Sequence, residues 1–201
     1  MTPDPADQPG LIDRLPLASW RLVVACSGLL GVGYAAQHVD LWWEGLSQQA
    51  SLATALLYFA LAGVGLVRPQ VSWSWLRGCL ATLLVLVAVG FQLVLDGDLG
   101  SRDALLEHVV TPVLVVVDYL VVGRDGGRRW WPASWLVLPA GYLVYAITAD
   151  VTRYDALDPN APDRLGLLGV LLLALAVGFV LWGLVRARLS AYDRDISASG
   201  R

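Results

Sequence analysis

Six long apolar stretches constrain the fold of this chain more than any other feature of its sequence. Crossing the roughly 30 Å hydrocarbon core of a bilayer takes about 20 apolar residues of helix, and each stretch is of that order. With 57% hydrophobic residues, 15% charged residues and a mean hydropathy of +0.61, the chain is too apolar for an ordinary soluble domain. The stretches are residues 17–37, 46–67, 76–95, 104–122, 131–149 and 165–185.

The apolar stretches predict helices rather than barrel strands. Backbone N–H and C=O groups must be paired inside hydrocarbon, which only helices and closed barrels achieve, and barrel strands alternate apolar and polar residues. We therefore expect an all-α fold, a polytopic membrane bundle of six transmembrane helices over residues 17–188, with cytoplasmic tails at 1–16 and 189–201. A cleaved signal peptide is the competing interpretation of the first stretch, but the segment before it is acidic rather than basic.

The arginines predict which way the bundle faces. All 14 basic residues are arginines, and most of them fall at helix ends that would share one side of the membrane. Cytoplasmic loops carry an excess of basic residues, so we expect both termini in the cytoplasm and a multi-pass protein of the plasma membrane. The outer loops are acidic. The arginines on the expected inner side are Arg14, Arg21, Arg68, Arg77, Arg124, Arg128, Arg129, Arg186, Arg188, Arg194 and Arg201.

The fourth expected span carries a polar stripe. His108, Thr111, Val115 and Asp118 are separated by steps of three, four and three residues, which places them on one face of a helix. Polar groups that face lipid are costly, so this face should point into the bundle. Pro112 removes a backbone donor and is expected to bend the helix near the histidine.

Two other expected spans carry stripes of the same kind. Three such stripes would meet in the interior of the bundle, because lipid disfavours polar side chains. They are Ser47, Ser51, Thr54 and Tyr58 in the second expected span, and Tyr142, Tyr145 and Thr148 in the fifth.

Ser47 and His108 are the candidate catalytic pair. Both lie within about one helical turn of the outer interface, so they can be neighbours, and a histidine beside a hydroxyl can remove its proton as the oxygen attacks. Asp118 lies about 15 Å deeper at 1.5 Å per residue. We expect it to be a structural polar residue that takes a hydrogen bond from another helix or an inner-rim arginine, or that stays protonated.

Three segments resemble a known family: "GLSQQASLATALLYFALAG", "LLEHVVTPVLVVVDYLV" and "LVLPAGYLVYAITADVTRYDALDP". With the six-helix layout, they are similar to the androgen-induced family of membrane proteins, which includes the androgen-dependent TFPI-regulating proteins, and most of all to its small actinobacterial members. The resemblance covers the chain from about residue 20 to residue 188. It implies a six-helix membrane hydrolase that cleaves fatty-acid esters of hydroxy fatty acids with a threonine nucleophile and a histidine.

The resemblance also implies roles for single residues. Ser47 stands where the family has its threonine, Gln49 matches a glutamine of the same motif, His108 matches the histidine, and Asp118 matches an acidic residue. The motif departs from the family at three places: serine replaces the threonine, an aromatic pair before it is Gly-Leu, and an asparagine after it is Ser51.

The leading hypothesis is therefore a lipid-ester hydrolase of the fatty-acid ester class near the outer leaflet, with a serine nucleophile and a histidine base. Substrate or oxyanion support would come from a further set of polar side chains, and the partners would be membrane lipids and a long-chain ester, with no nucleic acid, cofactor or metal ion. The alternative is a non-enzymatic membrane scaffold or lipid-binding protein, whose polar stripes only fasten helices together. The supporting side chains are Gln49, Ser51, Thr111, Tyr142 and Tyr145.

Two further interpretations have less support in the sequence. His38 and His108 both lie at outer helix ends, where two imidazoles could ligate a haem or, with acidic neighbours, a zinc ion. A channel or transporter would need a polar route across the membrane, with His108 and Asp118 at its two ends. The polar route is interrupted in the fourth expected span, because only apolar Val115 lies between Thr111 and Asp118 on that stripe.

Overall fold

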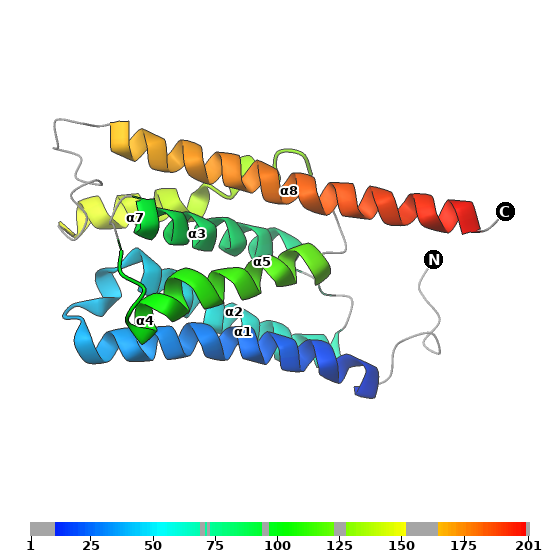
Figure 1. The fold of residues 1–201 in the computed structure, drawn as a ribbon, viewed down its shortest axis with the longest axis horizontal. Coiled ribbons are helices and arrows are strands. Elements are labelled where there is room, and N and C mark those ends of the chain that lie inside the picture. The colour runs from blue at the N-terminus through cyan, green and yellow to red at the C-terminus, as the bar shows by residue number, and fades with distance from the viewer. Residues whose placement is uncertain are drawn as a thin grey trace.

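Regular structure in the described part of the chain is entirely helical. The computed structural model describes residues 11–68, 71, 73–93, 97–122, 128–151 and 165–199 (Figure 1). The all-α prediction is confirmed for these residues. The elements are α1 (Leu11–His38), η2 (Trp42–Glu44), α2 (Leu46–Val67), α3 (Ser74–Leu93), α4 (Arg102–Leu105), η3 (Leu106–Val110), α5 (Thr111–Val122), α6 (Trp131–Ser134), α7 (Val137–Thr148) and α8 (Leu165–Ser199).

Within these ranges, five helices are long and apolar enough to cross a membrane. They are α1, α2, α3, the continuous run of α4, η3 and α5 from Arg102 to Val122, and α8. The first and the last of these helices are longer than the expected spans: α1 begins at Leu11 and α8 continues to Ser199. Residues 11–16 of the first expected tail and 189–199 of the second are thus helical, and the rest of both tails lies outside the described residues. The last turns of α8 project beyond the other helices in Figure 1.

The fifth expected span, residues 131–149, is not one helix. It is divided into α6 and α7 by a turn at Trp135 and Leu136. Pro139 explains the break, because its ring nitrogen cannot donate to the carbonyl of Trp135 four residues earlier and its ring would clash with that carbonyl. The Trp135 carbonyl accepts a contact from the Cys79 thiol instead, at 3.5 Å. The α7 ladder begins one residue later, where the N–H of Ala140 donates to Leu136.

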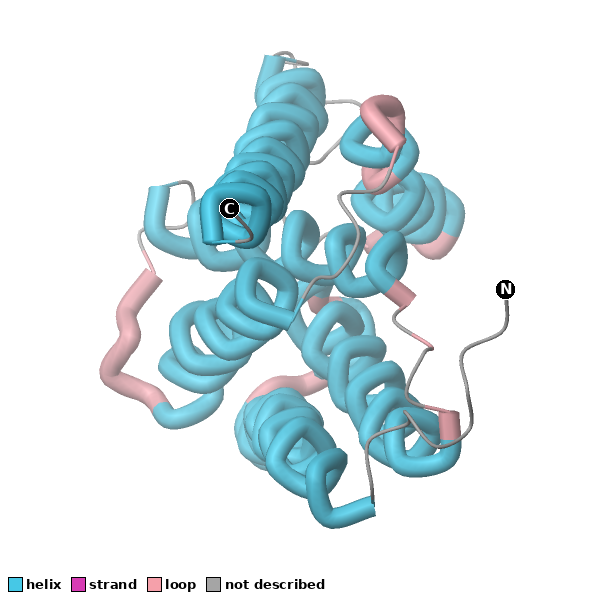
Figure 2. The backbone as a smooth tube through the Cα atoms, turned by 90° about the vertical axis from the view of Figure 1, so that its right-hand side faces the viewer, coloured by secondary structure: helices cyan, strands magenta, loops and turns pink. Residues whose placement is uncertain are grey.

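The helices run side by side and alternate in direction, so charges gather at two ends. Figure 2 looks along the bundle from one of them. We call the end that carries Asp40, Asp98, Asp103 and Asp150 the acidic end. The opposite, basic end carries the start of α1 and the end of α8 (Figure 1). There Arg14 donates to the carbonyl of Leu66 at 2.8 Å, and Arg188 contacts the carbonyls of Leu120 and Val121.

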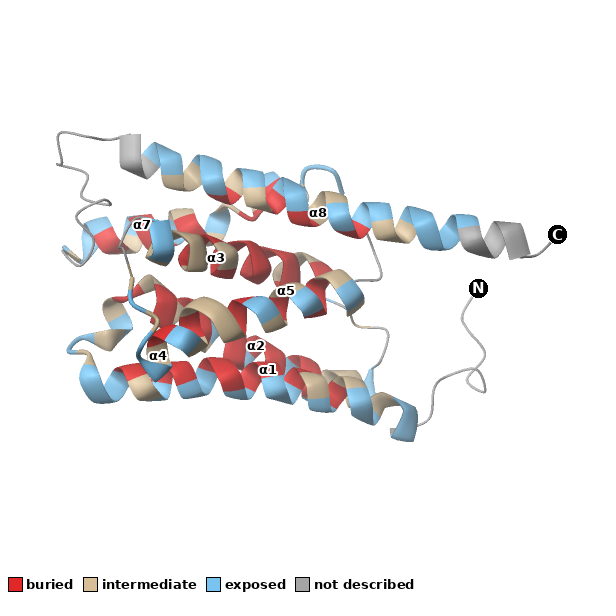
Figure 3. Cartoon of the chain, in the orientation of Figure 1, coloured by how far each residue is buried: buried red, intermediate tan, exposed pale blue. Residues whose placement is uncertain are grey.

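Burial follows the face of each helix. In Figure 3 the buried faces point toward the centre of the bundle and the exposed faces point outward. Many outward side chains are large and apolar, as in Leu56 on α2, Val113 on α5 and Val144 on α7, which are 63%, 55% and 62% exposed. Water disfavours so much exposed apolar surface, whereas hydrocarbon does not. The surface is thus suited to lipid.

The interior is held by close packing between α1 and α2. Gly28 of α1 lies so near α2 that a Cβ at this position would be 2.7 Å from the carbonyl oxygen of Ser51. Small residues of this kind let membrane helices approach each other closely. The approach brings the polar stripe of α2 toward η3 and α5, where the candidate site lies.

Candidate functional site

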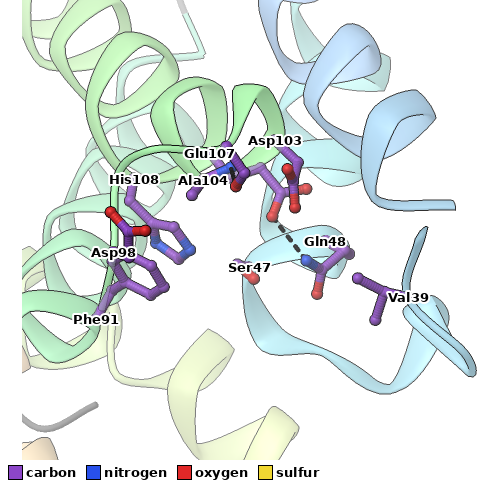
Figure 4. Close-up of a pocket in the computed structure, with 10 residues that line it drawn as sticks. Val39, Ser47, Gln48, Phe91, Asp98, Asp103, Ala104, Glu107 and His108 are labelled. Atoms are coloured by element: carbon purple, nitrogen blue, oxygen red, sulfur yellow. Dashed lines mark hydrogen bonds between the residues drawn. The ribbon is translucent and has the colours of Figure 1, made fainter. Parts of the chain in front are cut away.

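A pocket of about 240 Å³ lies at the acidic end, between the start of α2 and η3. Figure 4 shows the side chains around it, with Ser47 and Gln48 coming from α2 and Glu107 and His108 from η3. The two residues predicted to form the catalytic pair thus line one pocket. Its lining residues are Val39, Ser47, Gln48, Phe91, Asp98, Ser101, Asp103, Ala104, Glu107 and His108.

Ser47 occupies the second position of α2, which begins without a capping side chain. Gly45 is the N-cap residue and has no side chain to cap the first backbone N–H groups of the helix. The first intrahelical donor in this turn is the N–H of Gln49, which bonds the Gly45 carbonyl at 3.0 Å. The N–H groups of Leu46, Ser47 and Gln48 therefore have no acceptor inside the helix, and the positive end of the helix dipole lies beside the serine.

His108 lies on a widened turn of its helix. Residues Leu106–Val110 form a π-helix, closed by the N–H of Thr111 donating to the carbonyl of Leu106 five residues earlier. Pro112, two residues beyond this turn, cannot donate to the carbonyl of His108. We expected Pro112 to bend the helix near the histidine; the feature that the structure shows there is this π turn. Such turns occur often at functional sites, and here two consecutive side chains, Glu107 and His108, line the pocket.

The imidazole of His108 is held by stacking. Its ring lies parallel to that of Phe91, with centroids 3.7 Å apart and an interplanar angle of 6°. Nδ1 of His108 is buried and has no hydrogen-bond partner among the described residues. In the view of Figure 4, Ser47 lies between His108 and Gln48. No direct hydrogen bond joins the serine to the histidine in this part of the chain, although both side chains line the pocket.

Gln48 and Glu107 form a buried polar pair behind the serine. Nε2 of Gln48 donates to Oε2 of Glu107 at 2.7 Å, and the two residues are only 7% and 1% exposed. Gly31 of α1 makes room for the carboxylate, because a Cβ on this glycine would lie 2.8 Å from the Cγ of Glu107. The pair was not among the residues singled out from the sequence.

The structure places Gln48, rather than Gln49, in the pocket. Nε2 of Gln49 donates to the carbonyl of Trp43 at 2.8 Å on the exposed side of the helix, and Gln49 does not line the pocket. Helical spacing distinguishes the two glutamines: Gln48 precedes the buried Ser51 by three residues and so shares its face, whereas Gln49 precedes it by two. The choice of Gln49 followed the family motif instead of this spacing.

The other side chains expected to support a substrate lie outside the pocket lining. Ser51 is fully buried one turn deeper, and its Oγ has no partner within the described ranges. Thr111 shares a 3.1 Å hydrogen bond with Ser27 of α1. Tyr142 donates to the carbonyl of Glu44 at 2.9 Å. Tyr145 contacts the Tyr142 ring at a centroid distance of 6.0 Å.

The polar stripes of the second and fourth expected spans face the interior as predicted, and the third does so in part. Ser47, Ser51, Thr54 and Tyr58 are all buried, as are Thr111, Val115 and Asp118. In α7, Tyr142 is buried, but Thr148 is exposed and donates to carbonyls of its own helix. The third stripe fails at Thr148, which is the last residue of α7 and is exposed.

Asp118 is the centre of a buried network in the half of the bundle nearer the basic end. Its Oδ2 accepts from Nε of Arg77 at 2.7 Å and from the hydroxyl of Tyr58 at 2.8 Å, and its Oδ1 accepts from Nε1 of Trp20 at 3.2 Å. Nη2 of Arg77 lies 2.6 Å from the carboxylate and also bonds the Asp118 carbonyl. Of the alternatives expected for Asp118, a bond from another helix is confirmed, with Arg77 of α3 as one donor. The network ties α1, α2, α3 and α5 together.

The second histidine lies apart from the pocket. His38 is exposed at the end of α1 and does not line the cavity that His108 lines. Among the described residues, no group of three or more His, Cys, Asp or Glu side chains is arranged to hold a metal ion.

Comparisons with known proteins give no match: no family model, no curated protein and no solved structure matches the chain. The resemblance to the androgen-induced family therefore stays a prediction from the sequence.

Proposed function

We propose that this protein is a membrane hydrolase of long-chain lipid esters, with Ser47 as nucleophile and His108 as general base. The observation that carries the proposal is that two helices far apart in the sequence bring these side chains to one pocket at the end of the bundle (Figure 4). A hydroxyl and an imidazole that line one pocket are the minimum apparatus for nucleophilic ester cleavage.

The chemistry proceeds in two balanced steps. Ser47 Oγ attacks the ester carbonyl while His108 takes its proton, the bond from the carbonyl carbon to the alcohol oxygen breaks, and His108 returns the proton to the departing alcohol. Water then attacks the acyl-serine by the same route, His108 again moving the proton, and the fatty acid leaves. The products are one alcohol and one acid for each water consumed.

The start of α2 is suited to stabilise the oxyanion. Backbone N–H groups without an acceptor are effective donors to a developing negative charge, and those of Ser47 and Gln48 lie in the uncapped first turn. Gln48 replaces Gln49 as the glutamine nearest the reaction. Because its Nε2 is bonded to Glu107, we assign the side chain to shaping the pocket and the backbone N–H groups to the oxyanion.

The position of the pocket favours a substrate that lies in the bilayer. The acyl chain would remain among outward apolar side chains, while the ester carbonyl reaches the polar pocket at the membrane surface. By the positive-inside rule, we place the basic end in the cytoplasm and the acidic end in the outer leaflet of the plasma membrane. Six membrane passes follow if α6 and α7 cross together as a broken helix.

A purely structural role is the second candidate, and the Asp118 network favours it for the deeper polar residues. Those side chains bond to one another and to helix backbone, which is how a scaffold would use them. The pocket residues Ser47 and His108 differ, since both line the pocket and Nδ1 of His108 has no hydrogen-bond partner among the described residues. The structural role therefore accounts for the deeper polar residues, and the hydrolase proposal concerns the pocket residues near the acidic end.

Labelling by a fluorophosphonate probe in membranes tests the proposal. We expect the probe to modify Ser47, and Ser47→Ala and His108→Ala each to abolish labelling and ester turnover while leaving the thermal unfolding temperature of the folded protein in place. Ser51→Ala is the matched control, because this serine lies one turn deeper on the same helix and outside the pocket lining. Absence of label on Ser47, or equal turnover in Ser47→Ala and the parent, contradicts the hydrolase.

A further inference from the structure

The described arginines of the basic end are used in two ways. Some reach inward: Arg14 and Arg188 contact the last carbonyls of α2 and α5, and Arg77 pairs with Asp118. Three others, on the side of the bundle formed by α6 and α8, are exposed, and their guanidinium groups have no hydrogen bond or ion pair to a described residue. These three are Arg128, Arg129 and Arg186.

Packing between α6 and α8 brings the three exposed arginines to one place. A Cβ on Gly178 of α8 would lie 3.4 Å from the Cβ of Pro132 on α6. The helices alternate in direction, so α8 runs toward the basic end while α6 starts on that side of the contact (Figure 1). Gly178, Trp182 and Arg186 are four residues apart, which keeps them on the face of α8 that adjoins α6. Arg186 and the exposed pair before α6 therefore lie on the same side of the contact.

Side chains along this face of α8 change from apolar to charged toward the basic end. The ring of Phe179 packs edge-on against Trp182, with centroids 6.5 Å apart, and the guanidinium carbon of Arg186 lies 5.5 Å from the Trp182 ring centroid. Trp130, directly before α6, adds a second indole that is 53% exposed. Tryptophan is typical of the level where lipid chains meet headgroups. The surface thus offers apolar contacts to acyl chains and guanidinium groups to a headgroup.

The positive charge of this surface has no local compensation in the sequence. No Asp or Glu occurs in residues 128–134 or 178–188. Guanidinium groups bind phosphate oxygens through paired N–H donors, and basic sites between membrane helices attract anionic headgroups. A zwitterionic headgroup brings a cation together with its phosphate, and the arginines repel that cation. Charge complementarity therefore favours an anionic phospholipid.

We propose that the face of α8 beside α6 is a binding site for one anionic phospholipid. The phosphate of this lipid lies among Arg128, Arg129 and Arg186. Its glycerol region lies against Trp182, and its acyl chains lie along the apolar side chains of α8. The site is at the opposite end of the bundle from Ser47, and the inference does not depend on the proposed hydrolysis.

Two ether-linked phospholipids test the site, since neither contains an ester that the protein could hydrolyse. The full-length protein in detergent is titrated with diether phosphatidylglycerol or diether phosphatidylcholine of equal chain length, and bound lipid is counted by native mass spectrometry. We expect phosphatidylglycerol to bind at least about fivefold more tightly, the contribution of one arginine near an anionic headgroup. Glycerol phosphate, added as the free headgroup, should not displace the bound lipid, because it lacks the acyl chains.

Variants of exposed arginines locate the preference. Arg186→Gln should lower the affinity for phosphatidylglycerol about fivefold, and the double variant Arg128→Gln with Arg129→Gln should lower it to the level of phosphatidylcholine. Arg68→Gln is the matched control and should bind like the parent, because Arg68 is exposed at the end of α2, beside α1 and away from α8 (Figure 1). Equal affinity for the two lipids, the same loss in Arg68→Gln as in Arg186→Gln, or displacement by glycerol phosphate overturns the proposal.

Discussion

Removing the carboxylate of Asp118 should destabilise the bundle far more than most single substitutions. Asp118 and Arg77 are both fully buried and form an ion pair at 2.6 Å. Removing one partner leaves an uncompensated buried charge, at a cost of about 3–5 kcal/mol. The hydrogen bond from Tyr58 adds about 0.6 kcal/mol, the average for bonds between membrane helices. Asp118→Ala should therefore lose about 4–5 kcal/mol of unfolding free energy.

Unfolding by sodium dodecyl sulfate in mixed micelles, followed by the fluorescence of the nine tryptophans, measures this loss. The control is the double variant Arg77→Met with Asp118→Leu, because replacing a whole buried ion pair by apolar residues is often nearly neutral. We expect it to recover at least half of the loss. A loss under about 1 kcal/mol in Asp118→Ala, or additive losses in the double variant, refutes a buried and charged pair.

Two further predictions concern the pocket. Gly31→Ala should push the Glu107 side chain aside, because a Cβ would lie 2.8 Å from its Cγ. We expect a loss of about 1–3 kcal/mol, typical of overpacking, in the same unfolding titration, and an unchanged midpoint would show that α1 does not approach η3 so closely. Gln48→Leu should lower ester turnover at least about tenfold, since it leaves the Glu107 carboxylate without its amide donor, while Gln49→Leu retains parental turnover in the same assay. Lower turnover in Gln49→Leu than in Gln48→Leu would instead support the sequence-based choice of Gln49.

Much of the fold could be predicted because lipid imposes simple rules. Length and continuous apolarity identify the five long helices, and the three-and-four spacing identifies the faces of α2 and α5 that point inward. The arginine partner of Asp118 could also be anticipated, because a buried carboxylate needs a donor and Arg77 lies at a similar depth on another helix. These predictions depend on single helices and on depth, which a sequence shows directly.

The remaining features depend on how helices meet, and spacing on one helix does not reveal that. The break at Trp135 could have been inferred from Pro139, but apolarity on both sides favoured one continuous span. The π turn widens the helix at Glu107, so a rule that assumes 3.6 residues per turn does not predict that Glu107 lines the pocket. Gln48, the partner of Glu107, could have been found from its spacing to Ser51. The contact between Gln48 and Glu107 could not, because it depends on the packing of α1, α2 and η3.

Detection of an acyl-serine intermediate is the most direct test of the account. Purified protein in liposomes is mixed with 6-hydroxyhexyl palmitate, a neutral long-chain ester, quenched in acid within one turnover, digested and analysed by mass spectrometry. We predict a palmitoyl adduct on the peptide that contains Ser47, absent in Ser47→Ala and in His108→Ala. Release of palmitate without an adduct on Ser47, or the same release from the Ser47→Ala variant, would contradict the claim that this pocket performs the hydrolysis.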